Sequence, residues 1–211
     1  MATFTSRFGD FKLDPDAPIY RFEPAPLAPV TLNDPALAVM TDLRKVRALV
    51  IGPQAPIRVA HQLMIHAKVR LLGVVDDGGR LLGVITARDL LGEKPLTVAT
   101  RERIRHDRIV VEQIMTTRAQ MNPLSLKEVE KATVRDIVML LRDVGRQHVV
   151  VVEPRAQRGG YHACGIFSIT QIGRQLGLDI SPEGQVQSFA EVEHLLAEGD
   201  SALHSAGAIA S

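Results

Sequence analysis

The residues in this sequence best suited to chemistry form a short polar motif between two apolar stretches. Gly83 lies three residues before Thr86, Asp89 lies three residues after it, and Arg88 stands between them. An apolar run before Thr86 and a helical pattern after it predict a strand running into a helix start, whose free N–H groups form an anion site. The ionised carboxylate of Asp89 can accept two hydrogen bonds from a vicinal diol. These four residues are therefore the first candidate ligand-binding set.

A second, weaker candidate set repeats this spacing later in the chain, at Gly165, Ser168 and Gln171. The amide of Gln171 can bond a hydroxyl but lacks the charge of a carboxylate. Both sets also match the capping box, in which a hydroxyl and the third following side chain satisfy N–H groups at a helix start. Ser168 and Gln171 match that box closely. Capping without any ligand is therefore the alternative interpretation of both sets.

Other kinds of reactive site find little support. The single cysteine, Cys164, excludes an internal disulfide and any multi-thiolate metal site, and we expect it to be a buried structural thiol. His61 and His66 are five residues apart and would point to different sides of a helix. The spacings of zinc proteases, phosphate loops, dinucleotide folds and serine hydrolases do not occur. The sequence therefore predicts no catalytic residue and no metal site.

The composition indicates a soluble globular protein of somewhat more than one average domain. Of its 211 residues, 45% are hydrophobic and 23% charged, and the formal net charge is +1. Near neutrality and a shortage of aromatic residues after position 22 argue against nucleic-acid binding. Neither a signal peptide nor an apolar run of membrane-spanning length occurs, so we expect a cytoplasmic protein that does not contact membranes.

An internal repeat organises most of the chain. The triplet Val39-Met40-Thr41 recurs 75 residues later as Ile114-Met115-Thr116. The apolar run 72–76 recurs at 149–153, and Gly83-Val84-Ile85-Thr86 recurs as Gly165-Ile166-Phe167-Ser168. The register drifts where the short turn 77–80 corresponds to the longer loop 154–162, and loops are where insertions are tolerated.

Each copy predicts the same order of elements. Apolar residues at helical spacing near 60–67 and 134–141 predict an amphipathic helix, and two short β-branched runs follow it as a hairpin. A further short helix begins after Thr86 and after Ser168. We therefore expect an α/β (α+β) fold of tandem repeats, each strand, helix, strand, strand, helix. Met64, Met115 and Met139 are expected to fill the core rather than to bind a ligand.

Five segments follow from this pattern. A Pro-rich extended arm occupies residues 1–35, and its aromatic side chains suggest that it docks on an apolar surface. The first repeat spans 36–92 and the second 112–178. The charged stretch 93–111 between them is expected to be a solvated linker. Residues 179–211 should form a short helix, with one apolar stripe through Phe189, Val192, Leu195 and Leu196, and a frayed end.

With these motifs in place, the chain resembles proteins built of paired CBS (cystathionine β-synthase) domains, and in particular a stand-alone Bateman module. The resemblance covers roughly residues 36–178 and rests on the repeated triplets and on the Gly83–Asp89 motif. It implies pseudo-twofold units with clefts between them, a non-catalytic regulatory role, and pairing into homodimers. Many members bind AMP, ADP, ATP, S-adenosylmethionine or NAD as regulatory ligands, with no obligatory cofactor, and act on a separate effector.

The resemblance also assigns roles to residues. By position, Asp89 would hold the ribose diol and Thr86 the phosphate, with Ser168 taking the hydroxyl role in the second copy. Arg88 could reach a phosphate, whereas Arg146 and His148 are expected to be exposed edge residues. Two alternatives remain, a ligand-free dimerisation scaffold and an enzyme with an unfamiliar site. We expect a homodimer joined through the first helices of the repeats.

Overall fold

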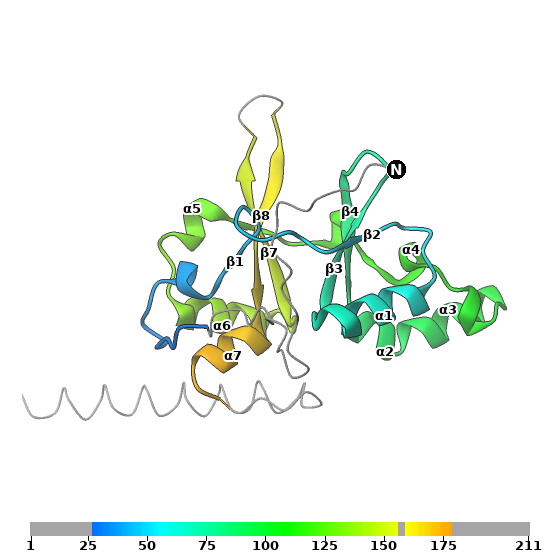
Figure 1. The fold of residues 1–211 in the computed structure, drawn as a ribbon, viewed down its shortest axis with the longest axis horizontal. Coiled ribbons are helices and arrows are strands. Elements are labelled where there is room, and N and C mark those ends of the chain that lie inside the picture. Colours follow the sequence, from blue (N-terminus) through cyan, green and yellow to red (C-terminus); the bar gives the residue numbers. More distant parts are fainter. Residues whose placement is uncertain (1–26, 156–158, 179–211) are drawn as a thin grey trace, which may run out of the picture.

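The computed structural model describes residues 27–155 and 159–178. In that part of the chain two four-stranded sheets lie side by side, each accompanied by its own helices (Figure 1). The first unit runs strand, helix, strand, strand, helix, and the second differs by one additional short helix before its first long one, so the predicted α/β fold of tandem repeats is confirmed. The aromatic residues of the N-terminal arm and the apolar stripe at 189–196 lie outside the described residues.

The first unit follows the expected element order. It consists of β2 (Val50–Ile51), α1 (Ile57–Ala67), β3 (Leu71–Val75), β4 (Leu81–Thr86) and α2 (Ala87–Leu91). β2 is parallel to β3, and β3 forms an antiparallel hairpin with β4. This order places Thr86, where β4 ends and α2 begins, at the end of an inner strand of the sheet.

The second unit repeats this arrangement with a longer hairpin. It consists of β6 (Leu124–Ser125), α5 (Leu126–Val129), α6 (Val134–Asp143), β7 (His148–Pro154), β8 (Tyr161–Ser168) and α7 (Ile169–Gln175). β6 is parallel to β7, and β7 pairs with β8 in antiparallel register from His148–Ser168 to Pro154–Tyr161. The hairpin extends past the body of the protein (Figure 1), as the longer loop in the sequence predicts.

Each sheet receives its fourth strand from the chain segment that precedes the other unit. β1 (Thr41–Asp42) pairs with β8, and β5 (Thr116–Thr117) pairs with β4. We call residues 39–42 and 114–117 the crossing segments. They contain the repeated triplets, which stand at the start of each repeat in sequence but complete the opposite sheet in space. The two units are therefore joined through their sheets as well as through the linker.

The stretch between the units is more than a solvated linker. It forms α3 (Lys94–Glu102), η2 (His106–Arg108) and α4 (Val111–Ile114). Val98, Ile109 and the residues of α4 at positions 111 and 114 are buried in the core of the first unit. The arginines of this stretch lie exposed, as expected for a solvated face. The charge pattern therefore correctly predicted an exposed polar face. It did not predict the buried apolar face of the same segment.

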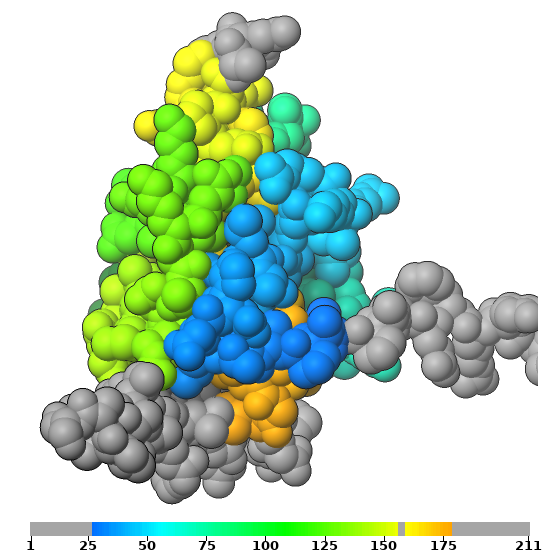
Figure 2. Space-filling model, turned by 90° about the vertical axis from the view of Figure 1, so that its left-hand side faces the viewer, coloured from blue at the N-terminus to red at the C-terminus, as the bar shows by residue number. Residues whose placement is uncertain are grey.

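The N-terminal part of the described chain packs on the second unit. Val30 donates its N–H to the carbonyl of Gln175 at 2.9 Å, and the 3₁₀ helix η1 (Ala36–Val39) lies in the core of the second unit. Figure 2 shows this blue segment lying against the orange α7 and the green residues of the second unit. That core also contains Cys164, which is buried as predicted.

Candidate functional site

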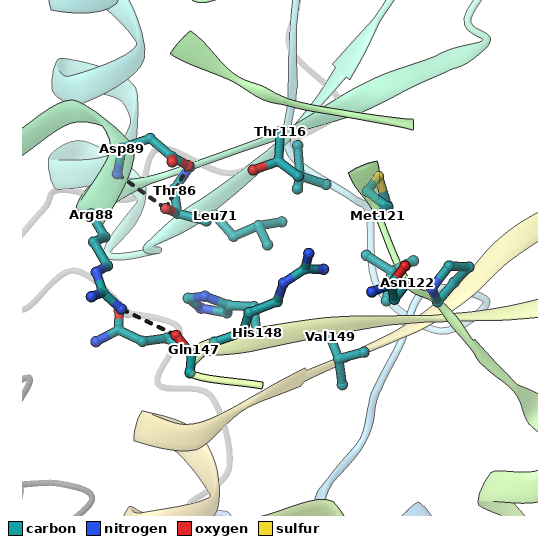
Figure 3. A pocket seen from close by; sticks show the side chains of 15 residues that line it. Leu71, Thr86, Arg88, Asp89, Thr116, Met121, Asn122, Gln147, His148 and Val149 are labelled. Carbon is teal, nitrogen blue, oxygen red and sulfur yellow. Dashed lines mark hydrogen bonds between the residues drawn. The ribbon is translucent and has the colours of Figure 1, made fainter. Parts of the chain in front are cut away.

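A pocket opens between the two units and contains most of the first candidate set (Figure 3). Its empty volume is about 670 Å³, part of it open to solvent. One wall comes from β3, β4 and α2 of the first unit, and the other from β7 and the residues just before β6. The lining residues are Leu71, Val84, Thr86, Arg88, Asp89, Thr116, Met121, Asn122, Pro123, Gly145, Arg146, Gln147, His148, Val149 and Val150.

Thr86 and Asp89 lie together at the edge of this pocket and cap α2. The Asp89 N–H donates to Thr86 Oγ1 at 3.2 Å, and Asp89 Oδ2 accepts from the N–H and the hydroxyl of Thr86 at 2.8 and 2.7 Å. The capping interpretation of this pair is thus confirmed. Asp89 is only 8% exposed yet lines the pocket. Capping and proximity to a ligand site therefore coincide in the same side chain.

Lys94 holds the other oxygen of the same carboxylate. Its Nζ lies 2.5 Å from Asp89 Oδ1 and donates to the carbonyl oxygen of Ile114 at 3.1 Å. The lysine begins α3, so the ion pair joins the ends of α2 and α4. Nothing in the sequence singled out Lys94, because its partners are brought to it only by the folding of the connecting stretch.

Two arginines lie at the pocket and reach across to other elements. Arg88 Nη1 donates to the carbonyl of Gly145 at 3.2 Å, which links α2 to the turn before β7. Arg146 Nη2 donates to the carbonyl of Gln120 at 2.9 Å. Both bonds leave further guanidinium N–H groups available, because an arginine carries five. The pocket therefore holds two positive charges able to attract an anion.

His148 faces Thr86 and Asp89 from the opposite wall (Figure 3). Its Nδ1 is buried and has no hydrogen-bond partner among the described residues. The pKa of His148 is lowered from 6.5 to about 4, mainly by burial and then by the charge of Arg70, while Asp89 acts in the opposite direction. The expectation that Arg146 and His148 are exposed edge residues is wrong, because the first unit covers the start of β7.

Gly83 belongs to the motif but does not line the pocket. A Cβ at this position would overlap the carbonyl oxygen of Thr116 and lie 3.1 Å from its carbonyl carbon. The glycine is required because β5, paired with β4, brings its backbone very close to Gly83, and backbone atoms cannot give way as a flexible side chain can. Its place next to Thr86 reflects the crossing segment rather than direct contact with a ligand.

The second candidate set lies away from this pocket, in β8 and α7. Ser168 makes no side-chain cap, so the close match to a capping box predicted the wrong contact. Gln171 turns instead to the crossing segment, where its Oε1 accepts from Thr41 Oγ1 at 2.9 Å and its Nε2 lies 3.4 Å from the carbonyl of Val39. Gly165 packs against the side chain of Met40. The amide group of Gln171 is therefore engaged by the chain itself.

The described residues contain neither a cluster of metal-ligating side chains nor a membrane-spanning helix. No group of three or more His, Cys, Asp or Glu side chains in 27–155 and 159–178 could hold a metal ion. The helices in those ranges are too short or too polar to cross a bilayer.

Comparison with known proteins finds a family match in the N-terminal half of the chain. Residues 27–95 match the family model of the CBS domain. A stretch of 70 residues, 33% of this chain, is 30% identical to the uncharacterized protein MK0525 of Methanopyrus kandleri, of which it covers 36%. The chain thus spans little more than a third of that relative. The family match confirms the resemblance drawn from the repeated motifs.

Solved structures of low sequence identity align over most of the described chain. An uncharacterized conserved protein from Pyrococcus horikoshii is 19% identical, with a TM-score of 0.49 over 72% of this chain and 98% of that one. The CBS-pair protein CBSX2 of Arabidopsis thaliana, in complex with AMP, is 21% identical, with a TM-score of 0.45 over 67% of this chain and 94% of that one.

Proposed function

We propose that this chain, of which residues 27–95 match the family model of the CBS domain, is a non-catalytic regulatory module. It binds an adenosine-type nucleotide of the AMP, ADP or ATP class in the pocket between its two units and signals occupancy to a separate partner. The observation that carries the proposal is the position of Asp89, a buried carboxylate that lines a pocket containing two arginines.

The sugar of the nucleotide is assigned to Asp89. Its Oδ2 already accepts two hydrogen bonds from Thr86, and its Oδ1 accepts one from Lys94. A carboxylate offers about four lone-pair positions, so one acceptor position remains for a ribose hydroxyl. A charged acceptor in a pocket of restricted water access makes a strong hydrogen bond.

The phosphate is assigned to the basic side of the pocket. Arg88 and Arg146 present guanidinium groups from opposite walls. The hydroxyl of Thr86 already donates its proton to Asp89 Oδ2, so the arginines are the donors assigned to the phosphate. Arginine suits phosphate because its planar fork donates two parallel hydrogen bonds. His148 lies close by, and a bound anion would favour its protonated form.

The base is assigned to the apolar lining of the pocket. Leu71, Val84, Val149 and Val150 come from the central strands of both sheets. Apolar side chains of this kind contact the face of a purine without distinguishing its substituents. The proposal therefore names the adenosine class from family resemblance and from the polar groups, with S-adenosylmethionine and NAD as further candidates.

Binding is proposed at the first candidate set alone. The side chain of Gln171 is already bonded to Thr41 and lies near the carbonyl of Val39, so its hydrogen-bonding groups are engaged. Ser168 directly precedes α7, and the residue three positions later is the neutral Gln171 rather than a carboxylate. One nucleotide per chain is the expected stoichiometry.

A matched pair of variants tests the proposal. Asp89 and Asp136 form nearly identical capping boxes, because Asp136 Oδ2 accepts from the N–H and hydroxyl of Thr133 at 2.8 and 2.7 Å. Only Asp89 lies in the pocket. Calorimetric titration with AMP, ADP, ATP, S-adenosylmethionine and NAD should show saturable binding to the wild type and to Asp136→Asn. Asp89→Asn should bind at least about tenfold more weakly.

Thermal denaturation with the same ligands provides the second readout. A ligand present at 100 times its Kd stabilises the folded state by about 2.7 kcal/mol. The absence of both heat and stabilisation at millimolar concentrations of all five ligands would contradict nucleotide binding and favour the ligand-free scaffold. Equal weakening in both Asn variants would mean that helix capping, and not contact with the ligand, explains the effect.

We also propose that the chain forms a homodimer through the exposed apolar side chains of its long helices. α1 exposes Val59 and Ile65, the latter with 64% of its surface, and α6 exposes Met139. Sedimentation of the wild type as a dimer, and of Ile65→Asp as a 23.1 kDa monomer, would support this interface. A wild-type monomer at high concentration would contradict it.

A further inference from the structure

Lys94 connects α2 to the second crossing segment, beside the nucleotide pocket, through a single ammonium group. On one side it contacts Asp89 Oδ1, and on the other it donates to the carbonyl of Ile114, two residues before the pocket residue Thr116. The Lys94 side chain is 48% exposed, whereas that of Asp89 is 10% exposed. The lysine therefore brings a positive charge from the solvent side to a buried carboxylate.

The second unit makes the equivalent connection in a different way. By the repeat, Gln171 corresponds to Asp89, and the carbonyl of Val39 corresponds to that of Ile114. Gln171 reaches the crossing segment directly, with its amide group between Thr41 Oγ1 and the Val39 carbonyl. In the first unit Lys94 provides the contact with the carbonyl, so Asp89 need not turn toward the crossing segment.

This difference decides which acceptor positions remain open. Gln171 uses its oxygen and its amide nitrogen on the crossing segment, and its nitrogen also lies 3.4 Å from Gln175 Oε1. Asp89 keeps one acceptor position because Lys94 takes only one lone pair of Oδ1. The donors on Asp89 are fixed on both of its oxygens, which holds the plane of the carboxylate in one orientation.

We propose that Lys94 is a positioning residue for the nucleotide site. Lys94, and not Asp89 itself, makes the contact between α2 and the carbonyl of Ile114 in the crossing segment. Its ammonium group also holds the Asp89 carboxylate in one orientation. One acceptor position of that carboxylate therefore stays open for a ribose hydroxyl. This inference rests on the proposed function, since it assigns Lys94 a part in recognising the sugar. It predicts that Lys94 affects the contribution of the diol to binding and leaves base and phosphate contacts unchanged.

The test compares AMP with 2′,3′-dideoxy-AMP, which lacks the diol. Kd values for both are measured by calorimetry on the full chain, for the wild type and for Lys94→Met, Lys94→Arg and Lys131→Met. Lys131 is an exposed lysine outside the pocket and serves as the matched control. A hydrogen bond to a charged group corresponds to roughly 10- to 100-fold in affinity.

We expect the wild type and Lys131→Met to prefer AMP by about tenfold or more. In Lys94→Met the preference should fall to about twofold or less, with the Kd for the dideoxy nucleotide changed by no more than about twofold. Lys94→Arg, which keeps the charge, should recover most of the preference. Unchanged dideoxy binding also verifies that the Lys94→Met pocket is folded.

Other results would overturn the inference. If Lys94→Met keeps the preference for AMP, Lys94 has only a structural role, while nucleotide binding itself stands. If Lys94→Met binds AMP more tightly, the lysine competes with the diol rather than positioning its acceptor. If the wild type binds neither nucleotide, the proposed function fails first, and the inference fails with it.

Discussion

Thr41 and Gln171, 130 residues apart in the sequence, are joined by a hydrogen bond of 2.9 Å between Thr41 Oγ1 and Gln171 Oε1. The bond fastens the first crossing segment to the last described helix. It explains why an amide stands where the first unit has a carboxylate. An amide can accept from a hydroxyl and donate to a carbonyl with one side chain, whereas an ionised carboxylate only accepts.

Removing the amide of Gln171 should lower the stability of the fold and leave the affinity for the nucleotide unchanged. Gln171→Met leaves Thr41 and the Val39 carbonyl without a side-chain partner, and we expect the free energy of unfolding to fall by about 1–2 kcal/mol. Urea unfolding of Gln171→Met, Thr41→Val and the double variant gives the coupling between the two side chains. A coupling near zero would contradict the bond. A loss of AMP binding in Gln171→Met would place a ligand at the second set.

Three glycines should respond differently to an added methyl group. In Gly83→Ala the new Cβ meets the backbone of Thr116, and we expect a loss of roughly 1–3 kcal/mol or more. In Gly165→Ala it meets the flexible side chain of Met40, which can move, so the loss should be smaller. Gly52 has no atom within 4 Å of such a Cβ and serves as the control, with an effect within about 0.5 kcal/mol.

Thermal or urea denaturation ranks these variants. The order Gly83, then Gly165, then Gly52 is the expected result. Equal stability of Gly83→Ala and Gly52→Ala would mean that the backbone of β5 does not approach Gly83 so closely in solution.

Protonation of His148 should destabilise the folded protein in mild acid. The folded pKa is about 4, against 6.5 for an unperturbed histidine, so the unfolded chain binds the proton more readily. The stabilising contribution is complete above pH 6.5 and is lost as the pH falls toward 4. Over that range the loss is about 3 kcal/mol, at 1.36 kcal/mol per pKa unit.

The measurement is urea unfolding at several pH values between 4 and 7. His148→Gln should lose less stability than the wild type over this range, and His66→Gln, at an exposed site of α1, should follow the wild type. Parallel curves for the wild type and His148→Gln would show that other groups account for acid sensitivity.

Arg88 should contribute to affinity only when the ligand carries a phosphate. Its guanidinium lines the pocket and makes one bond, to the carbonyl of Gly145. We expect Arg88→Met to weaken AMP binding by about tenfold and to leave adenosine binding within about twofold. Arg101→Met, in the exposed part of α3, is the matched control. If the affinities for AMP and adenosine fall equally, Arg88 maintains the shape of the pocket and does not contact the phosphate.

The sequence by itself determined the repeated unit and the first candidate set. Alternating and helical apolar patterns are local properties, and they correctly placed the main helices and the hairpins of the two repeats and the Thr86–Asp89 cap, but not the helices of the connecting stretch. The same local logic failed at Ser168, where the expected capping box is absent. Capping is a competition between partners, and the crossing segment supplies a partner that lies 130 residues away.

Only the tertiary structure decided which side chains share a pocket. His148 and Arg146 lie at the start of β7, and the sequence gives no sign that the first unit covers them. Lys94 reaches Asp89 because α3 folds back on α2, and Gly83 faces Thr116 because β5 joins the opposite sheet. Patterns of three or four residues specify helices and strands, since those contacts are local. The pocket depends on contacts between segments distant in sequence, which are fixed only when both sheets assemble.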